Sequence, residues 1–460
     1  MTHEPGDRFP PPALRSPWPA PRPVSFATDV RRGFRPPVNR SETIRALSDE
    51  LGALQQPIRI LDAVAWGDEV AARFFAGGAR AQPEVDRDYY TEHRPLRFDP
   101  AGLRVDLASL RTRVAKKLGT APVGDLLSAR IGEYLGVIDM LEARGTPAFA
   151  PIAAGLYGAT TDPLHPGGPD LGSLGSLMSD ALGNIDSGTW EPPEDHPHTA
   201  EEGVEILTRR LGEVCGIDEV RIILDDGIVA DAAAGGDYIK LRADAMFSSR
   251  DLRVLEVHEG WVHVATTLNG RRQPWCTFLG KGTPSTTSTQ EGLAVFTEIT
   301  TLSSTPERLR KVTRRILAIE MAEQGATFLD IFEWFRGEGL SDGDAWSSSV
   351  RVFRGSTPVD GPFTKDLAYS RGFLEVYDFM RLAVRRGRLE RLPLLFAGKL
   401  AIAEIGVLAT LAEEGLVTPP DILPPHISDL SALASWMAFS NLLNRIDLGA
   451  MEEHLSPALD

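Results

Sequence analysis

The feature that most constrains this chain is a pair of histidines, His258 and His263, in the segment VLEVHEGWVHVATTLNG at residues 254–270. On a regular α-helix, residues five positions apart diverge by about 140°, so the two imidazole rings would point to different sides. One inserted residue that forms a π-bulge turns both rings to one side, and such bulges occur mostly at functional sites. Gly260 lowers the energy of this distortion. The sequence therefore predicts a locally widened helix on which both histidines bind one metal ion.

Two histidines do not complete a catalytic zinc site, which needs a third protein ligand and an open fourth position. The candidate third ligand is Glu291 in TSTQEGLAVFTEITTL, where a second amphipathic helix is predicted to begin at Glu291 with Ser288 or Thr289 near its cap. Glu259, directly after the first histidine, is placed to take a proton from a water molecule on the metal. Glu298 lies on roughly the same helical face as Glu291. It either supports a histidine from behind or is a solvated carboxylate.

The elements around the motif predict an α+β fold that is mostly helical, with a small mixed sheet beside the histidine helix. HTAEEGVEIL begins a helix with a capping box formed by Thr199 and Glu202, and VRIILDD and IVADAAAGGDYIKL follow as strands. Ser248 and Asp251 can cap the next helix, which would carry both histidines in its second half. An edge strand that holds an extended peptide, followed by a metal-binding helix, is typical of a zincin-like metallopeptidase core.

Three regions are predicted along the chain. Residues 1–40 are a Pro-rich arm, RFPPPALRSPWPAPRPVSF, that is expected to be partly disordered. Residues 41–190 are an N-terminal helical region, with Ser41 as a candidate N-cap and a loop-rich stretch from 160 onward. Residues 191–460 are the zincin-like catalytic region, completed by C-terminal helices. Among these, SALASWMAFSNLLNRIDL is expected to complete the core with its apolar face.

The composition of the chain limits which partners it is expected to bind and in which compartment it is expected to lie. A net charge of −16 argues against binding to nucleic acid or to an anionic membrane through bulk electrostatics. Apolar stretches are too short to span a bilayer, and no export leader opens the chain, so we expect a cytoplasmic protein. Cys215 and Cys276 are expected to be two reduced thiols, because they match neither a disulfide framework nor a CxxC site. The oligomeric state does not follow from the sequence.

A group of cations and one tyrosine lies in the irregular stretch RVFRGSTPVDGPFTKDLAYSRG: Arg351, Arg354, Lys365, Tyr369 and Arg371. In an acidic protein, such a group suits an anion pocket in which cations hold a carboxylate and a donor stabilises an oxyanion. Arg354, just before a glycine, is the favoured cation and Tyr369 the favoured oxyanion donor; solvation at the surface is the alternative for each. Arg272 in NGRRQPW is a further candidate. Trp275 and Phe278 either line a pocket for a bulky side chain or are buried in the core.

The motifs HEGWVH, NGRRQPW and QEGLA together resemble the QEGLA-motif family, whose animal members are the tyrosine carboxypeptidases that remove the terminal tyrosine of α-tubulin. The resemblance extends from about residue 55 to the C-terminus and includes ILDAVAWGDEVAARFF, GTPAFAPIAAGLYG, FTKDLAYSRGFLEVY and LLFAGKL. It implies one Zn²⁺ per chain, bound by His258, His263 and Glu291, with Glu259 as general base and acid. Many relatives read HEIGTH, so Trp261 adds bulk where a smaller residue would fit easily.

Taken together, these features predict a zinc-dependent metallopeptidase, and specifically a carboxypeptidase acting on the C-terminus of a peptide or protein, with aromatic terminal residues among the candidates. Two alternatives stay open. One is a non-catalytic metal-binding regulator that affects the expression of another protein, since bacterial relatives are named for such an effect. The other is a zinc endopeptidase, for which the cations would be incidental. Acidic tubulin tails are not expected to be attracted to a chain of net charge −16. The richness in Ala, Gly, Arg and Pro suggests a GC-rich bacterial genome.

Overall fold

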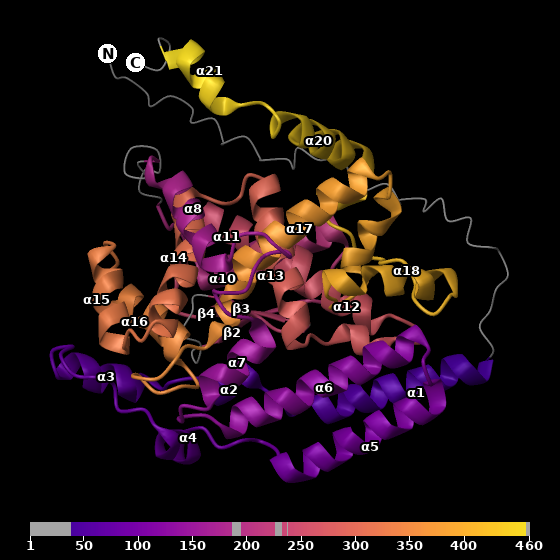
Figure 1. Cartoon of the computed structure of the whole chain (residues 1–460), viewed down its shortest axis with the longest axis horizontal. Coiled ribbons are helices and arrows are strands. Elements are labelled where there is room, and N and C mark those ends of the chain that lie inside the picture. Colours follow the sequence, from indigo (N-terminus) through magenta and orange to yellow (C-terminus); the bar gives the residue numbers. More distant parts are fainter. Residues whose placement is uncertain (1–37, 186–194, 226–231, 237, 457–460) are drawn as a thin grey trace, which may run out of the picture.

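The structure is a computed structural model, and it describes residues 38–185, 195–225, 232–236 and 238–456. The Pro-rich arm predicted for residues 1–40 therefore lies almost entirely outside the described residues. The described part is mostly helical with a small mixed sheet, as the sequence predicted (Figure 1). None of the described helices is both long and apolar enough to cross a lipid bilayer.

The N-terminal region forms the predicted helical layer. Its longest helices, α1 (Val38–Gln55), α5 (Pro100–Leu118) and α6 (Pro122–Glu142), lie along the lower edge of Figure 1. Ser41 is not the N-cap of α1, because the helix begins at Val38 and Ser41 is buried inside it. Two prolines precede Val38 in the sequence, and proline favours a helix start. The shorter helices are α2 (Ile60–Val64), α3 (Asp68–Ala76), α4 (Arg87–His93) and α7 (Phe149–Tyr157).

The stretch predicted as loop-rich contains a helix, α8 (Leu171–Gly183), whose first turn is capped by the Asp170 side chain. α8 packs against α14 (Pro306–Glu323). A side chain at Gly175 would meet Ile316 of α14 at 2.8 Å, so the small residues of α8 permit a close approach. Packing of α8 against α14 therefore outweighs the low helix propensity of glycine. This packing cannot be predicted from the sequence pattern of α8 alone.

The small sheet has the strand order β2-β4-β3. β2 (Arg221–Asp225) and β4 (Tyr238–Arg242) run parallel, whereas β3 (Ala232–Ala234) pairs antiparallel with β4. β1 (His198–Thr199) and β5 (Met246–Phe247) form a separate antiparallel pair. β4 is thus central, and the edge strands of the three-stranded sheet are β2 and β3. An edge strand, β3, precedes the histidine helix as expected, with the central strand β4 between them in the sequence. The zincin-like core itself stays a prediction.

The histidine helix is one continuous rod made of α11 (Ser249–Leu255), the π-helix η1 (Glu256–Val264) and α12 (Ala265–Arg271). Ser248 and Asp251 form the predicted capping box at its start, as do Thr199 and Glu202 on α10 (Ala200–Cys215). The widened turn is confirmed, although it extends over nine residues rather than one bulge. Because the rod continues to Arg271, His258 and His263 lie near its middle. A side chain at Gly260 would lie 2.3 Å from Leu211, so this glycine also lets α10 approach.

The remaining elements form the C-terminal half of the chain: η2 (Thr277–Gly280), α13 (Pro284–Thr300), α15 (Phe328–Gly337), α16 (Asp342–Phe353), η3 (Thr364–Leu367), α17 (Ala368–Arg385), η4 (Leu389–Arg391), η5 (Pro393–Phe396), η6 (Ile402–Glu404), α18 (Ile405–Glu413), α19 (Pro425–Ser428), α20 (Leu430–Leu443) and α21 (Leu448–Leu455). The largest buried cluster joins residues of α1, α5 and α6 to residues between 262 and 437. The core is therefore continuous across residue 190, and the predicted division there stays a prediction.

α20 departs from its expected role. Leu433 and Met437 are buried, as predicted for a helix that completes the core. Large apolar side chains on another face of α20, including Phe439 and Leu443, are exposed. α20 has more apolar residues than positions that face the core. The sequence pattern therefore does not show which of these residues are buried and which are exposed.

Candidate metal centre and active site

His258 and His263 converge on a single carboxylate oxygen. Glu291 Oε2 lies 3.6 Å from His258 Nε2 and 3.5 Å from His263 Nε2, and the two imidazole centroids are 5.0 Å apart. Glu291 lies in the middle of α13 and not at its start, as the sequence pattern had suggested. α13 begins at Pro284, with Thr283 as its N-cap residue. The π-helix and α13 thus hold the three predicted ligands together.

The donor set fits a zinc ion. Zinc ligands lie about 2.0–2.2 Å from the metal, so two ligand atoms of a tetrahedral site are about 3.4 Å apart. Both contacts of Glu291 Oε2 are close to that spacing and longer than a good hydrogen bond. Glu291 Oε2 is also buried without a hydrogen-bond partner. A buried carboxylate oxygen without a donor is destabilising, and a cation between the three side chains would stabilise it.

Glu259 is a competing third ligand, since donor atoms of His258, Glu259 and His263 lie within 4.8 Å of one another. Its Oε1 is 4.0 Å from His258 Nε2, farther away than Glu291 Oε2. Glu291 is the better candidate for a third ligand, because its Oε2 is nearly equidistant from both imidazole Nε2 atoms. Glu259 then lies beside the candidate metal position as a candidate proton acceptor.

Glu298 supports His258 from behind. Its Oε1 lies 2.5 Å from His258 Nδ1 and accepts a 2.6 Å hydrogen bond from Arg308 Nη2, while Oε2 is bonded to Arg308 Nε. Burial alone would raise the pKa of Glu298, but the bonds from Arg308 and His258 lower that pKa to about 2. Glu298 is buried, so the alternative of a solvated carboxylate is wrong. Burial lowers the pKa of His258, but the carboxylates of Glu259, Glu291 and Glu298 outweigh burial and raise that pKa well above its usual value when no metal is bound. A neutral ring that donates from Nδ1 to Glu298 has its lone pair on Nε2, the atom nearest Glu291, and this is the form that binds a metal.

The other end of the π-helix is held by a residue that the sequence motifs did not assign to the site. Lys399 Nζ donates hydrogen bonds to the carbonyl oxygen of His263 at 3.0 Å and to Gln290 Oε1 at 2.8 Å. Thr267 Oγ1 also donates to the His263 carbonyl, and Thr266 Oγ1 to Gln290 Oε1. Burial lowers the pKa of Lys399 to about 8. Lys399 lies in LLFAGKL, a string noted for the family resemblance alone.

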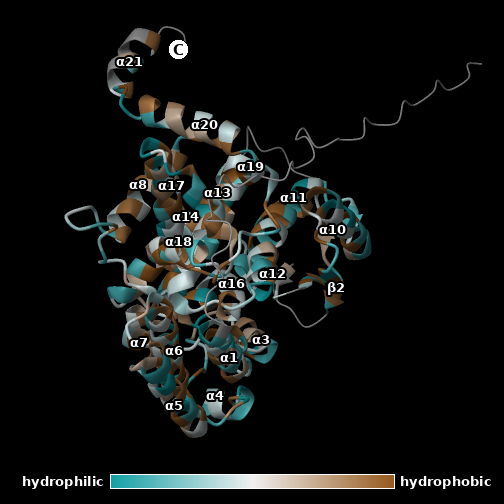
Figure 2. Ribbon diagram, turned by 90° about the vertical axis from the view of Figure 1, so that its right-hand side faces the viewer, coloured by the Kyte–Doolittle hydropathy of each residue, from teal (hydrophilic) through white to brown (hydrophobic). Residues whose placement is uncertain are grey.

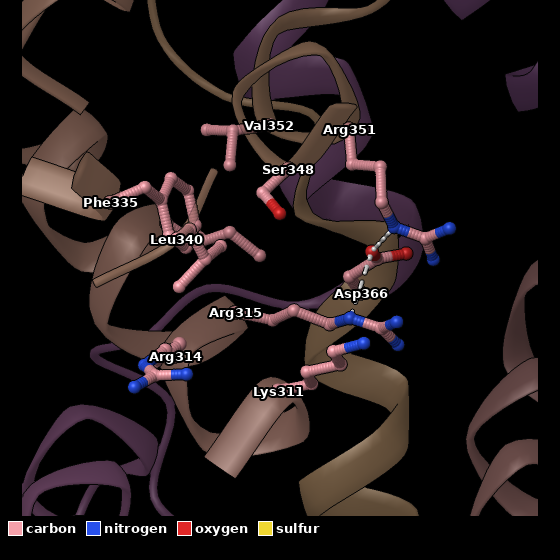
Figure 3. A pocket seen from close by; sticks show the side chains of 10 residues that line it. Lys311, Arg314, Arg315, Phe335, Leu340, Ser348, Arg351, Val352 and Asp366 are labelled. Atoms are coloured by element: carbon pink, nitrogen blue, oxygen red, sulfur yellow. Dashed lines mark hydrogen bonds and ion pairs between the residues drawn. The ribbon is translucent and has the colours of Figure 1, made fainter. Parts of the chain in front are cut away.

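Three arginines surround one buried carboxylate, Asp366, and Figure 3 shows two of them, Arg351 and Arg315. Asp366 Oδ2 lies 2.7 Å from Arg351 Nε and 3.8 Å from Arg315 Nε, and Oδ1 lies 3.7 Å from Arg354 Nη2. Burial, and then the neighbouring charge of Arg351, lower the pKa of Arg354 to about 10. The sequence missed Arg315 because it lies on α14, outside the irregular stretch that carries the other two. Positive charge therefore exceeds negative charge around Asp366.

Lys365 and Tyr369 connect this arginine group to the metal ligands. Lys365 Nζ lies 3.2 Å from Glu291 Oε1. The Tyr369 ring stacks 6.5 Å from the His258 ring, and the Arg315 guanidinium lies 4.3 Å from the centre of the tyrosine ring. Tyr369 thus lies between His258 and Arg315. The positions of these residues in the sequence did not predict this contact.

Two predicted cations are turned elsewhere. Arg272 pairs with Glu219 and lies 3.9 Å from Asp421, and Arg371 pairs with Glu375 and lies 3.7 Å from Asp162. Among the described residues, neither of them is a neighbour of the three candidate ligands. The side-chain direction of an arginine depends on the carboxylates that tertiary structure brings to it, and these carboxylates are distant in sequence.

Of the three aromatic residues singled out from the sequence, two are buried and Trp275 is partly buried. Phe278 is buried and Trp275 packs against the main core. Trp261, the bulky departure from the family pattern, is fully buried, with the Arg253 guanidinium 4.5 Å from its ring and the His426 ring stacked at 6.1 Å. The bulk of Trp261 is therefore accommodated in the core cluster around the sheet. Both cysteines are free thiols, and Cys276 is buried.

An open groove of about 320 Å³ lies beside the metal ligands. His263 and Glu291 form part of its lining, together with Lys281, Lys365 and Lys399. Glycines after β3 and around η2 line another part of the groove, and threonines of α12 and α13 line it as well. A smaller cavity of about 60 Å³ lies beside Asp366, and it is lined by arginines and apolar side chains (Figure 3). The site therefore offers an extended, cation-lined surface next to the histidines.

The chain has been compared with known proteins. No curated protein matches it. The family model described as microtubule-associated tyrosine carboxypeptidase matches residues 72–445, which is most of the chain and includes the histidine helix, α13 and the arginine group. The match agrees with the resemblance read from HEGWVH and QEGLA. The chain therefore belongs to the microtubule-associated tyrosine carboxypeptidase family, a family of carboxypeptidases.

Proposed function

We propose that this protein is a zinc-dependent metallocarboxypeptidase that removes a C-terminal residue from a peptide or protein. The observation that carries the proposal is the convergence of two imidazole Nε2 atoms on the buried, unpartnered oxygen of Glu291, with Glu259 beside them. His258, His263 and Glu291 would hold the metal. Membership in a carboxypeptidase family supports the reaction type.

Glu259 carries the proton transfers. When bound, zinc supplies Lewis acidity that activates water and polarises a carbonyl. The Glu259 carboxylate accepts the proton of the attacking water and then gives it to the departing amine. The carboxylate is partly exposed, so it can reach a substrate in the groove, and it lies 4.0 Å from His258 Nε2. Glu298 keeps His258 in the tautomer that leaves Nε2 unprotonated.

The arginine group is suited to hold the terminal carboxylate. Arg315, Arg351 and Arg354 share a single buried carboxylate, Asp366, and an uncompensated buried charge is costly. A substrate carboxylate would offset that charge through charge-assisted hydrogen bonds. Arg351 and Arg315 are 33% and 25% exposed, whereas Arg354 is 14% exposed and lies over the Phe363 ring. We therefore favour Arg315 and Arg351 for contact with substrate. Arg351 also holds Asp366 at 2.7 Å, and the less exposed Arg354 adds positive charge beside that carboxylate.

Lys365 and Tyr369 lie between this group and the metal ligands. One residue of extended chain spans roughly 3.3–3.6 Å, so a terminal carboxylate must be bound within about that distance of the reacting carbonyl. Lys365, next to Glu291, and Tyr369, against His258, are the nearest donors on this side. We assign Tyr369 to stabilisation of the oxyanion and Lys365 to the carboxylate or to Glu291 itself.

The proposal is tested by metal content and by substrate form. The purified protein should hold about one zinc per chain. His263→Ala should abolish binding, whereas Glu259→Gln should keep the metal and stop turnover. Peptides that differ only in a free or amidated C-terminus should then be compared. Loss of the charged contact should reduce turnover of the amidated peptide by one to two orders of magnitude, about 1.5–3 kcal/mol.

A matched pair of variants separates the arginine group from general charge effects. Arg351→Met should lower turnover of the free-acid peptide, while Arg371→Met, whose side chain is paired with Glu375, should not. Equal cleavage of free and amidated peptides would indicate an endopeptidase. Cleavage of neither form by a zinc-loaded protein would favour a metal-binding regulator, and full zinc retention in His263→Ala would refute the ligand assignment.

A further inference from the structure

α20 has one face that is packed and one that is not. On the packed face, Tyr377 of α17 hydrogen-bonds to Ser440, and Arg381 Nε donates to Asn441 Oδ1 at 3.0 Å. The opposite face carries Phe439, Leu442 and Leu443, all exposed. Trp436 lies at the border between the two faces: it is half-exposed, and its ring centre is 6.4 Å from that of Tyr377. A surface helix normally places charged residues toward water. Between Leu430 and Asn444 the sequence has none.

The exposed apolar surface continues beyond α20. Ile446, between α20 and α21, and Leu448, the first residue of α21, are also exposed. In both views α20 and α21 extend from one end of the molecule (Figures 1 and 2), and the hydropathy colours of Figure 2 show hydrophobic residues along them. We name this surface the arm face and define it by Trp436, Phe439, Leu442, Leu443, Ile446 and Leu448.

The arm face is large enough for a stable interface. Its six side chains are between 46% and 78% exposed. Since a large apolar side chain presents about 150–250 Å², the face exposes roughly 700 Å² per chain. One partner in a standard protein interface contributes about 800 Å². Patches of this size on a lone soluble protein mark interaction sites.

The charged residues around the arm face indicate which kind of partner could cover it. Residues 429–455 carry Asp429, Asp447, Glu452 and Glu453 against a single Arg445. A helix that lies on an anionic bilayer is normally rich in Lys and Arg, so this segment does not suit such a membrane. An acidic partner protein is excluded on the same ground. A charge-depleted apolar centre with a polar rim is instead characteristic of homodimer interfaces.

We propose that the arm face pairs with the same face of a second copy of this chain. In a two-fold symmetric dimer both copies use the same surface, so the apolar side chains of each arm face are buried against those of the other. Antiparallel pairing of two α20 helices joins their uncharged centres, and it brings Arg445 of one copy toward the acidic residues at the rim of the other. The helices of two copies then form a small bundle outside both bodies.

The mass of the full-length protein tests this proposal, measured by light scattering after gel filtration from about 1 to about 100 µM. The wild type should have twice the chain mass of 50.1 kDa. Phe439→Glu combined with Leu443→Glu should raise the dissociation constant at least about 100-fold and give single chains. Val105→Glu, on an exposed apolar residue of α5, is the matched control and should leave the dimer intact. Circular dichroism of each variant checks that it is folded.

Four results would overturn the proposal. A single-chain mass for the wild type at every concentration would show that the arm face does not pair, whether it is bare or covered by another part of the same chain. A dimer that survives the double substitution would place the interface elsewhere. Loss of the dimer in Val105→Glu would show a nonspecific effect of added charge. Sedimentation of the wild type, but not of the double variant, with phosphatidylcholine vesicles would identify a lipid surface as the occupant.

Discussion

Glu298→Gln is the most informative single substitution at the metal centre. In the wild type, Glu298 Oε1 accepts from both His258 Nδ1 and Arg308 Nη2, and Oε2 is bonded to Arg308 Nε. Glutamine has nearly the same shape but one acceptor and one donor end. If its amide NH₂ faces His258, the Nδ1 proton must move to Nε2 and block the metal-binding lone pair. If it faces Arg308, two donors meet. Either orientation disturbs the site.

The magnitude follows from the pKa of Glu298, which is about 2 in the folded protein against 4.5 ordinarily. A shift of that size corresponds to about 3 kcal/mol of differential stabilisation of the charged form. Because the folded-state pKa is lowered, this contribution is present above about pH 4.5 and is lost as the pH falls toward 2. Removing the charge should therefore cost up to about 3 kcal/mol at neutral pH. Loss of a carboxylate behind a metal-binding histidine should weaken zinc affinity by about 10–100-fold.

Two measurements separate the effects on stability and on metal binding. Urea unfolding of the metal-free protein gives the change in stability, and competition with a chelator gives the zinc affinity. The control is Glu256→Gln, because Glu256 is also buried in the π-helix and lies 2.9 Å from Arg253 rather than beside a histidine. We expect Glu256→Gln to lower stability while its zinc affinity stays within about 3-fold of the wild type. Equal zinc affinities for the two variants would refute the tautomer argument.

Three further predictions concern the surroundings of the site. Lys399→Met should lower zinc affinity by about 10-fold. The unfolding free energy should change by less than about 1 kcal/mol, because Thr267 Oγ1 still donates to the His263 carbonyl oxygen. Unchanged zinc affinity in the chelator competition would show that Lys399 does not support the site. Gly292→Ala should lower the unfolding free energy, measured in urea, by about 3 kcal/mol or more, because the new Cβ would lie 1.9 Å from the Gly372 carbonyl carbon. The control is Gly132→Ala on α6, where the new Cβ meets no neighbour, and this variant should have a slightly higher unfolding free energy. Burial lowers the pKa of His426 to about 3, so below about pH 6.5 this histidine takes up a proton in the unfolded state but not in the folded state. Between pH 7.5 and 5, the unfolding free energy of the wild type should therefore fall by about 2 kcal/mol relative to that of His426→Phe, measured in the same urea titrations.

Several parts of the site could be predicted because their physics is local. The angle between positions on a helix requires a widened turn if His258 and His263 are to converge, and a π-helix is found there. Capping boxes depend on residues three positions apart, which explains why those at Thr199 and Ser248 were recognised. The QEGLA string identified α13 as the second ligand-bearing helix, although its start was placed seven residues too late.

Other parts depended on contacts between distant segments. Arg315 and Lys399 belong to the site only because α14 and the turn after η5 fold against it. Arg315 lies outside every motif quoted from the sequence, and Lys399 lies in LLFAGKL, to which the sequence assigned no role at the site. Arg272 and Arg371 had the right chemistry, but carboxylates far away in sequence turn them elsewhere. α8 forms because its glycines fit against α14. A pattern along the chain contains no information on such pairings.

The amino-acid sequence was enough to predict the candidate ligands, their spacing on the two helices, the mostly helical class and the family. These follow from bonded geometry and from residue chemistry, which act within a few positions of the chain. The packing of distant elements settles which cations meet around Asp366, which carboxylate lies behind His258, and which apolar face of α20 is exposed. Those outcomes depend on the packing of elements that are up to hundreds of residues apart, where one helix displaced by a few ångströms would give each side chain a different partner.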